Sequence, residues 1–158
     1  MADLLRRHGV PYYLKIDIEG NDGLCLEALE PGDLPAFVSV EAHRLEYLTT
    51  LWTKGYRQFR VVDQTRHNLS PLPPAGKTLR GRALRTALDL AQRVRTRLGV
   101  VETRFPAGSS GPVPDEAHDG WEELESVAYD WLHHRMGHHG RGTLNPGGWF
   151  DFHARRPA

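Results

Sequence analysis

The sequence predicts an α/β fold with mostly parallel strands and flanking helices, because strand-like and helix-like segments alternate along its first 63 residues. Strand-like aliphatic runs occupy 12–19, 37–42 and 56–62, and amphipathic segments separate them. Helical connections between successive strands imply right-handed crossovers and parallel pairing. The first two runs also end in carboxylates, and open α/β sheets bind their ligands at the carboxyl ends of their strands.

Composition places the chain among soluble proteins of one domain. Its 158 residues suffice for one real core, and its 20 basic and 20 acidic residues balance, which argues against wholesale nucleic-acid or membrane binding. Cys25 is the single cysteine, so no intrachain disulfide is possible, and we expect it to be a small buried apolar residue. The sequence has neither a membrane-span-length apolar run nor a signal peptide, so we expect a cytoplasmic protein.

The first strand-like run carries charge where a buried parallel strand would not. Lys15, Asp17 and Glu19 alternate with aliphatic residues, so a period of two predicts that the three charges share one face. Gly20 then ends the strand, and the next residues, Asn21 or Asp22, would cap a helix. The alternative interpretation is an edge strand with one solvent-exposed face. Local departures from the expected pattern tend to mark functional sites.

The remaining elements follow from apolar spacing and from breaker residues. We expect helices over 2–8, 22–29, 43–54, 78–98 and 121–136, and a terminal strand over 149–154 that would close the sheet. The predicted inward-facing residues include Leu4, Leu24 and Trp52.

Two regions of different composition meet near residue 70. Residues 1–70 form the α/β part, whereas 71–158 contain a Pro/Gly-rich linker, a basic helix, an acidic helix and the terminal strand, all expected to pack on the same domain. The basic helix is either a phosphate or nucleic-acid patch or a solvated face, and the acidic segment 115–130 offers it a counter-patch. We therefore favour the solvated face.

The main candidate site combines the charged ends of the first two strands. Lys15, Asp17 and Glu19 would meet Glu41 and His43 if these strands are neighbours. Such a set would take a proton from a hydroxyl, with a carboxylate or the imidazole as base, or hold a divalent cation through oxygen ligands. The alternative for Glu41 and His43 is capping of the following helix.

A second candidate is a histidine tract, formed by His133, His134, His138 and His139. Such a tract is typical of metal binding. Glycines between and after the two pairs favour a solvated turn, with a zinc hydrolase as the weaker alternative. The sequence lacks a Gly-x-Gly-x-x-Gly motif, a phosphate-binding loop and a Gly-x-Ser-x-Gly motif.

The segments 14–20, 38–43 and 55–57, with helices between them, resemble the C-terminal half of the FkbM-type methyltransferases over about residues 3–63. The resemblance implies a Rossmann-like sheet, S-adenosylmethionine as cofactor and a small-molecule or glycan hydroxyl as acceptor. It places Asp17 at the end of the fourth strand, flanked by Lys15 and Glu19, and Glu41 at the end of the fifth. His43 or a carboxylate would orient or deprotonate the hydroxyl.

The family binds its methyl donor largely on its first two strands, through a glycine-rich loop that this sequence lacks. By the resemblance, the chain would be the acceptor-side half of a truncated or split O-methyltransferase, and no residue is assigned to the donor. The alternatives are a non-catalytic fragment or assembly module and, more weakly, a metal-assisted hydrolase. An exposed strand edge would favour a homo-oligomer.

Overall fold

The computed structural model describes residues 1–64, 120–135 and 149–157, together with six isolated positions between 83 and 98. Their helices are α1 (Ala2–His8), α2 (Asp22–Glu27), the short 3-10 turn η1 (Pro31–Asp33), α3 (Glu46–Lys54) and α5 (Leu124–Arg135). Their strands are β1 (Tyr13–Ile16), β2 (Phe37–Glu41), β3 (Gln58–Asp63) and β4 (Phe150–Arg155). This mixed content confirms the predicted α/β class.

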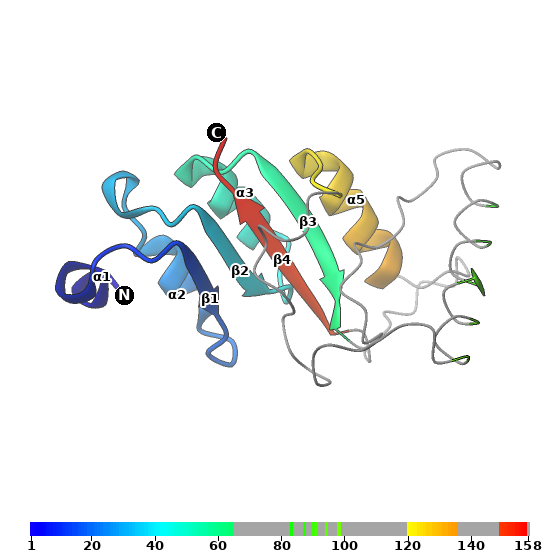
Figure 1. The fold of residues 1–158 in the computed structure, drawn as a ribbon, viewed down its shortest axis with the longest axis horizontal. Coiled ribbons are helices and arrows are strands. Elements are labelled where there is room, and N and C mark those ends of the chain that lie inside the picture. Colours follow the sequence, from blue (N-terminus) through cyan, green and yellow to red (C-terminus); the bar gives the residue numbers. More distant parts are fainter. Residues whose placement is uncertain are drawn as a thin grey trace.

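The four described strands form one open sheet in the order β1-β2-β4-β3 (Figure 1). β1 pairs with β2 in parallel, whereas β4 is antiparallel to both β2 and β3. The prediction of mostly parallel pairing is therefore wrong for these strands, although β1, β2 and β3 all point the same way. The cause is β4, which was expected to close the sheet and instead lies between β2 and β3.

β4 is a central strand because its sequence suits burial on both faces. Alternation places Phe150, Phe152 and Ala154 on one face and Asp151 and His153 on the other. All five side chains are buried, and Phe152, Ala154, Asp151 and His153 are fully so. The strand therefore contributes to an apolar core and to a polar layer at once.

The apolar core lies on the face of the sheet covered by α2, α3 and α5. Leu48 and Leu51 of α3 and Val127 of α5 are buried in the same cluster as the sheet residues Val40 and Phe152. Burial of an aliphatic side chain of this size contributes about 1.5–3 kcal/mol. Figure 1 shows α3 behind the sheet and α5 beside β3, and the two helices contact β4 and β3 respectively.

Several helix predictions needed correction at their ends and faces. α2 ends two residues earlier than expected and α3 begins three residues later. Leu4 is 57% exposed, Leu24 66% and Trp52 48%, whereas their neighbours Leu5 and Leu26 are buried. These helices have only a few turns, so the angle at which each one packs on its neighbours decides which of its apolar residues faces inward.

Most of the predicted basic helix lies outside the described residues, as do residues 115–119 of its acidic counter-patch. Ala87, Ala91 and Val94 are helical, and these three residues and Leu98 are exposed. The proposed boundary near residue 70 also falls outside the described part.

Candidate functional site

The parallel pairing of β1 with β2 brings the predicted site residues to one edge of the sheet, the edge formed by the carboxyl ends of these two strands. Lys15 lies opposite Ser39 in the register, and both strands run toward the same edge (Figure 1). The sequence prediction that these two strands are neighbours is confirmed. Four of the five predicted residues form contacts near this edge, in two separate groups: Lys15 with Asp17, and Glu41 with His43.

The shortest contact of Lys15 in the first group is with Asp151, a residue that was not predicted from the sequence. Its Nζ donates a hydrogen bond of 2.7 Å to Oδ2 of Asp151, and it lies 3.6 Å from Oδ2 of Asp17. Asp151 is fully buried, whereas about a quarter of the Lys15 side chain is exposed. A buried carboxylate is unfavourable without a charged partner, and the ammonium of Lys15 supplies that partner for Asp151. Because Lys15 is partly exposed, it also remains accessible near the carboxyl end of β1.

Glu41 and His43 form the second group. Nε2 of His43 lies 2.9 Å from Oε2 of Glu41, whose side chain is 15% exposed against 41% for His43. The alternative that these residues cap the next helix is not supported, because α3 begins at Glu46 with Leu45 as its N-cap and has no side-chain cap bond. The carboxylate instead orients an accessible imidazole.

Glu19 and Asp17 do not continue the alternation of β1. The strand ends at Ile16, Glu19 has a φ of +53°, and Gly20 has a φ of +89°. Both acidic side chains are exposed, and within the described part of the chain Glu19 contacts none of the other four predicted residues. The prediction that three charges share one strand face is therefore wrong beyond Lys15.

Asp22 holds the turn that replaces the expected strand end. Its carboxylate accepts hydrogen bonds from the backbone N–H groups of Ile18 at 3.0 Å and Gly20 at 3.3 Å. It is fully buried. Asn21 is the N-cap of α2 but makes no side-chain cap bond. Asp22 is thus a structural residue that fixes where Asp17 and Glu19 sit.

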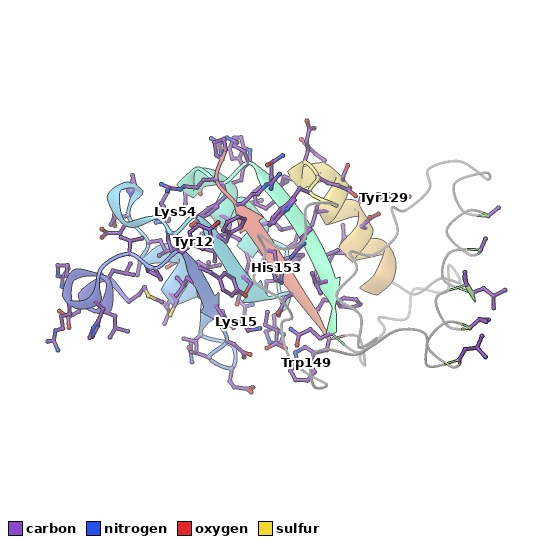
Figure 2. The ribbon with its side chains drawn as sticks, in the orientation of Figure 1. Tyr12, Lys15, Lys54, Tyr129, Trp149 and His153 are labelled. Carbon is purple, nitrogen blue, oxygen red and sulfur yellow. The ribbon has the colours of Figure 1, made fainter. Side chains whose placement is uncertain are left out.

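A polar layer covers the face of the sheet opposite the apolar core. The register places Lys15, Ser39, His153 and Arg60 in one row across all four strands. Ser39 and His153 are fully buried and Arg60 is 3% exposed. Ser39 shares a hydrogen bond of 2.6 Å with the Tyr13 hydroxyl. Figure 2 shows His153 midway along β4, with Lys15 on β1 to one side.

Burial dominates the electrostatics of this row. Burial lowers the pKa of Arg60, Tyr13 opposes this shift and nearby Arg155 adds to it, and together they bring the pKa to about 10. Burial also lowers the pKa of His153 well below its ordinary value, and the charges of Arg60 and Lys15 act in the same direction. His153 is therefore a neutral imidazole beside two cations at neutral pH.

Trp121 lies against the polar layer from outside the sheet. The guanidinium carbons of Arg60 and Arg155 lie 4.8 and 4.7 Å from its ring centroid, and Phe37 lies 6.0 Å away between centroids. Sequence reasoning placed Trp121 at the start of a helix, yet it precedes α5. Its neighbour Glu122 instead forms an isolated bridge with Phe59.

The sequence offered one signal for the polar layer. Aromatic and polar residues alternate in 149–154, which is typical of a strand with one polar face. Local spacing does not reveal that β4 lies beside β2. Asp151, His153 and Arg60 were therefore missed as a group.

Neither proposed metal site is supported by the described geometry. No three His, Cys, Asp or Glu side chains within the described ranges gather closely enough to hold an ion. His133 and His134 belong to α5, whereas His138 and His139 lie outside the described residues. Cys25 is half-buried against the core, as a small apolar residue would be.

Comparison with known proteins adds no relative. No family model, curated protein or solved structure matches the chain significantly. No helix in the described ranges is long and apolar enough to cross a membrane. The observations that bear on function are therefore the site geometry and the resemblance of segments 14–20, 38–43 and 55–57.

Proposed function

We propose that the chain provides the acceptor-side part of an S-adenosylmethionine-dependent O-methyltransferase of the FkbM type. The observation that carries the proposal is the parallel pairing of β1 with β2, which brings Lys15 and Asp17 to the same sheet edge as Glu41 and His43. Open α/β sheets hold their ligands at the carboxyl ends of such strands.

The arrangement of the strands supports a Rossmann-like sheet. β1, β2 and β3 point the same way, and helices connect them. Among the four described strands, β1 is the outermost on one side. A sheet that continued beyond β1 would place this strand in its middle, next to a donor-binding part. The charged turn after β1 would then lie at the centre of the larger sheet.

The residues present fit an acceptor hydroxyl better than the donor. The sequence lacks the glycine-rich turn that would hold the adenosyl part, so no residue of this sequence is assigned to donor binding. The donor supplies an electrophilic methyl group. On the acceptor side, His43 accepts the hydroxyl proton at a ring nitrogen, and Glu41 at 2.9 Å stabilises the resulting imidazolium. Lys15 and Asp17 orient the hydroxyl.

Transfer of a radiolabelled methyl group tests this proposal. The full chain would be purified from its native cell together with its bound partners. It would then be incubated with methyl-tritiated S-adenosylmethionine and pools of hydroxylated small molecules and glycans. Loss of a general base typically costs 10²–10⁴-fold in rate, so we expect His43→Gln to lower label transfer by about 100-fold or more. Lys15→Met should lower it less, because it acts on orientation.

Glu27→Gln is the matched control, since Glu27 is an exposed carboxylate on α2, away from the sheet edge. Its label transfer should equal that of the wild type. Absence of transfer in the wild-type preparation, or equal transfer by His43→Gln, would refute the proposal.

A second candidate function, an assembly module without catalysis, is favoured by the outermost position of β1 among the described strands. Among the described strands, β1 pairs only with β2, so its other side would accept a strand from a second chain. Analytical ultracentrifugation distinguishes the two functions when combined with the transfer assay. A stable oligomer that transfers no label would favour assembly, whereas a monomer without label transfer would exclude both.

A further inference from the structure

Two neighbouring side chains of the polar layer carry polar atoms that have no hydrogen-bond partner among the described residues. Arg60 and His153 lie opposite each other on β3 and β4. Within the described part of the chain, Nε and one terminal nitrogen of Arg60 and both ring nitrogens of His153 are buried without a hydrogen-bond partner. Native proteins pair almost all such buried groups, so four on two adjacent side chains indicate a missing partner.

The charges near these atoms indicate the sign of that partner. Oδ2 of Asp151 is engaged by Lys15 at 2.7 Å and this pair is neutral, whereas Oδ1 of Asp151 is buried without a hydrogen-bond partner among the described residues. No carboxylate of the described residues forms an ion pair with Arg60, which is 3% exposed. Arg155 donates to the neutral Gln58 side chain and adds a second positive charge on the same face. A buried cation without a counter-charge is unfavourable, and an anion would relieve it.

We propose that Arg60 and His153 form the base of a binding site for a small oxyanion, the carboxylate or phosphate group of a ligand. The site is independent of methyl transfer, because neither residue belongs to the sheet edge where the acceptor hydroxyl is assigned.

The donor geometry of both residues suits an oxyanion. The guanidinium presents N–H groups in a planar fork, which matches two oxygens of a carboxylate or phosphate. The neutral imidazole donates one N–H bond, and a neighbouring anion would favour its protonated form. Trp121, stacked on both Arg60 and Arg155, holds the two guanidinium groups without consuming their N–H donors.

Anion-dependent thermal stability and calorimetric titration test the site. Melting temperature would be measured with inorganic phosphate and, separately, with acetate and citrate, using chloride to keep the ionic strength constant. We expect stabilisation that saturates with phosphate or with a carboxylate, and the more effective probe identifies the source of the anion. If none of the three stabilises the protein beyond chloride, the proposal is overturned.

Variants assign the effect to these residues. Arg60→Gln should weaken anion binding at least tenfold, and Arg60→Lys, which keeps the charge but loses the fork, should weaken it less. Arg57→Gln is the matched control, because Arg57 also stacks on a tryptophan, Trp52, with 4.9 Å between guanidinium carbon and ring centroid, but lies at an exposed site. Equal binding by Arg60→Gln and wild type would overturn the proposal.

A measurement on the wild-type protein covers the case in which Arg60→Gln fails to fold. The imidazole of His153 would be followed by nuclear magnetic resonance in isotopically labelled protein during titration with the stabilising anion. Saturable ring-nitrogen shifts, with a higher apparent pKa for His153, are expected. Unchanged ring-nitrogen shifts and an unchanged pKa would place the anion elsewhere and refute the site.

Discussion

His153 lies in an environment that differs strongly from water. Its ring is fully buried on β4, and Arg60, Lys15 and Asp151 lie around it on the same face of the sheet. The two cations and the burial all oppose protonation in the folded state, and the Lys15 contact neutralises Asp151. The unfolded chain has no such restriction, so its imidazole titrates near the ordinary value of about 6.5.

This difference makes folding stability depend on pH in a defined window. Because the folded pKa is lowered, stability from His153 is constant above about pH 6.5 and falls as pH drops toward the folded pKa, where the unfolded state binds the extra proton. The slope should approach about 1.4 kcal/mol per pH unit below pH 6. Urea unfolding between pH 5 and 7, in buffers without phosphate or carboxylate, measures it.

Two variants isolate the contribution of this one ring. His153→Gln removes the titrating group and should flatten the slope between about pH 6.5 and 5. His8→Gln removes an exposed imidazole on α1 and should leave the slope unchanged. If His153→Gln keeps the wild-type slope, His153 does not control acid stability.

The candidate site could be predicted from sequence only where its residues are close along the chain. Lys15, Glu41 and His43 were identified because charged residues interrupt or end aliphatic runs. The partner of Lys15, Asp151, was missed because 136 positions separate the two residues. Their contact depends on which strand lies beside β2, and local side-chain periodicity carries no information about that choice.

At the scale of single elements, the turn between β1 and α2 determines the shape of the sheet edge. The alternation of charged and aliphatic residues predicted a strand through Glu19, but the backbone turns at residues 19 and 20 with positive φ. Asp22 stabilises this turn by accepting two backbone N–H bonds. A buried carboxylate that binds the preceding turn therefore overrides β propensity, which is a weak and context-dependent preference.

Gly20→Ala tests the strain of this turn. Nothing lies within 4 Å of the position that a Cβ would take, so the cost comes only from the φ of +89°, which alanine adopts reluctantly. We expect a loss of about 1 kcal/mol in the free energy of unfolding, measured by chemical denaturation. Gly32→Ala is the control, because its surroundings are equally open and its φ is not positive. Equal effects of the two substitutions would show that the turn is not strained.

At the scale of the whole molecule, the sheet is completed by the end of the chain. The sequence predicted the order of the first helices and strands and the common direction of β1, β2 and β3. It did not predict that β4 separates β2 from β3, because that pairing joins segments about 100 residues apart. Long-range pairing of this kind depends on which surfaces are buried together, and it also slows folding.

The central position of β4 predicts that the chain cannot fold without its last ten residues. Deleting 149–158 removes Phe150 and Phe152 from the core, and loss of a buried phenylalanine side chain alone typically costs about 3–5 kcal/mol. The deletion also leaves β2 and β3 without their shared partner. The combined loss exceeds much of the 5–15 kcal/mol stability of a typical domain. We expect no cooperative urea transition and collapsed amide dispersion in nuclear magnetic resonance spectra.

Deleting only 157–158 is the matched control, because β4 ends at Arg155 and Pro157 is exposed. This shorter deletion should unfold at the wild-type urea midpoint. A synthetic peptide of residues 149–158, added to the chain ending at 148, should restore dispersion if the lost strand is the cause. A cooperative transition in the chain ending at 148 without the peptide would mean that β2 and β3 do not need β4 between them, and would contradict the sheet order described above.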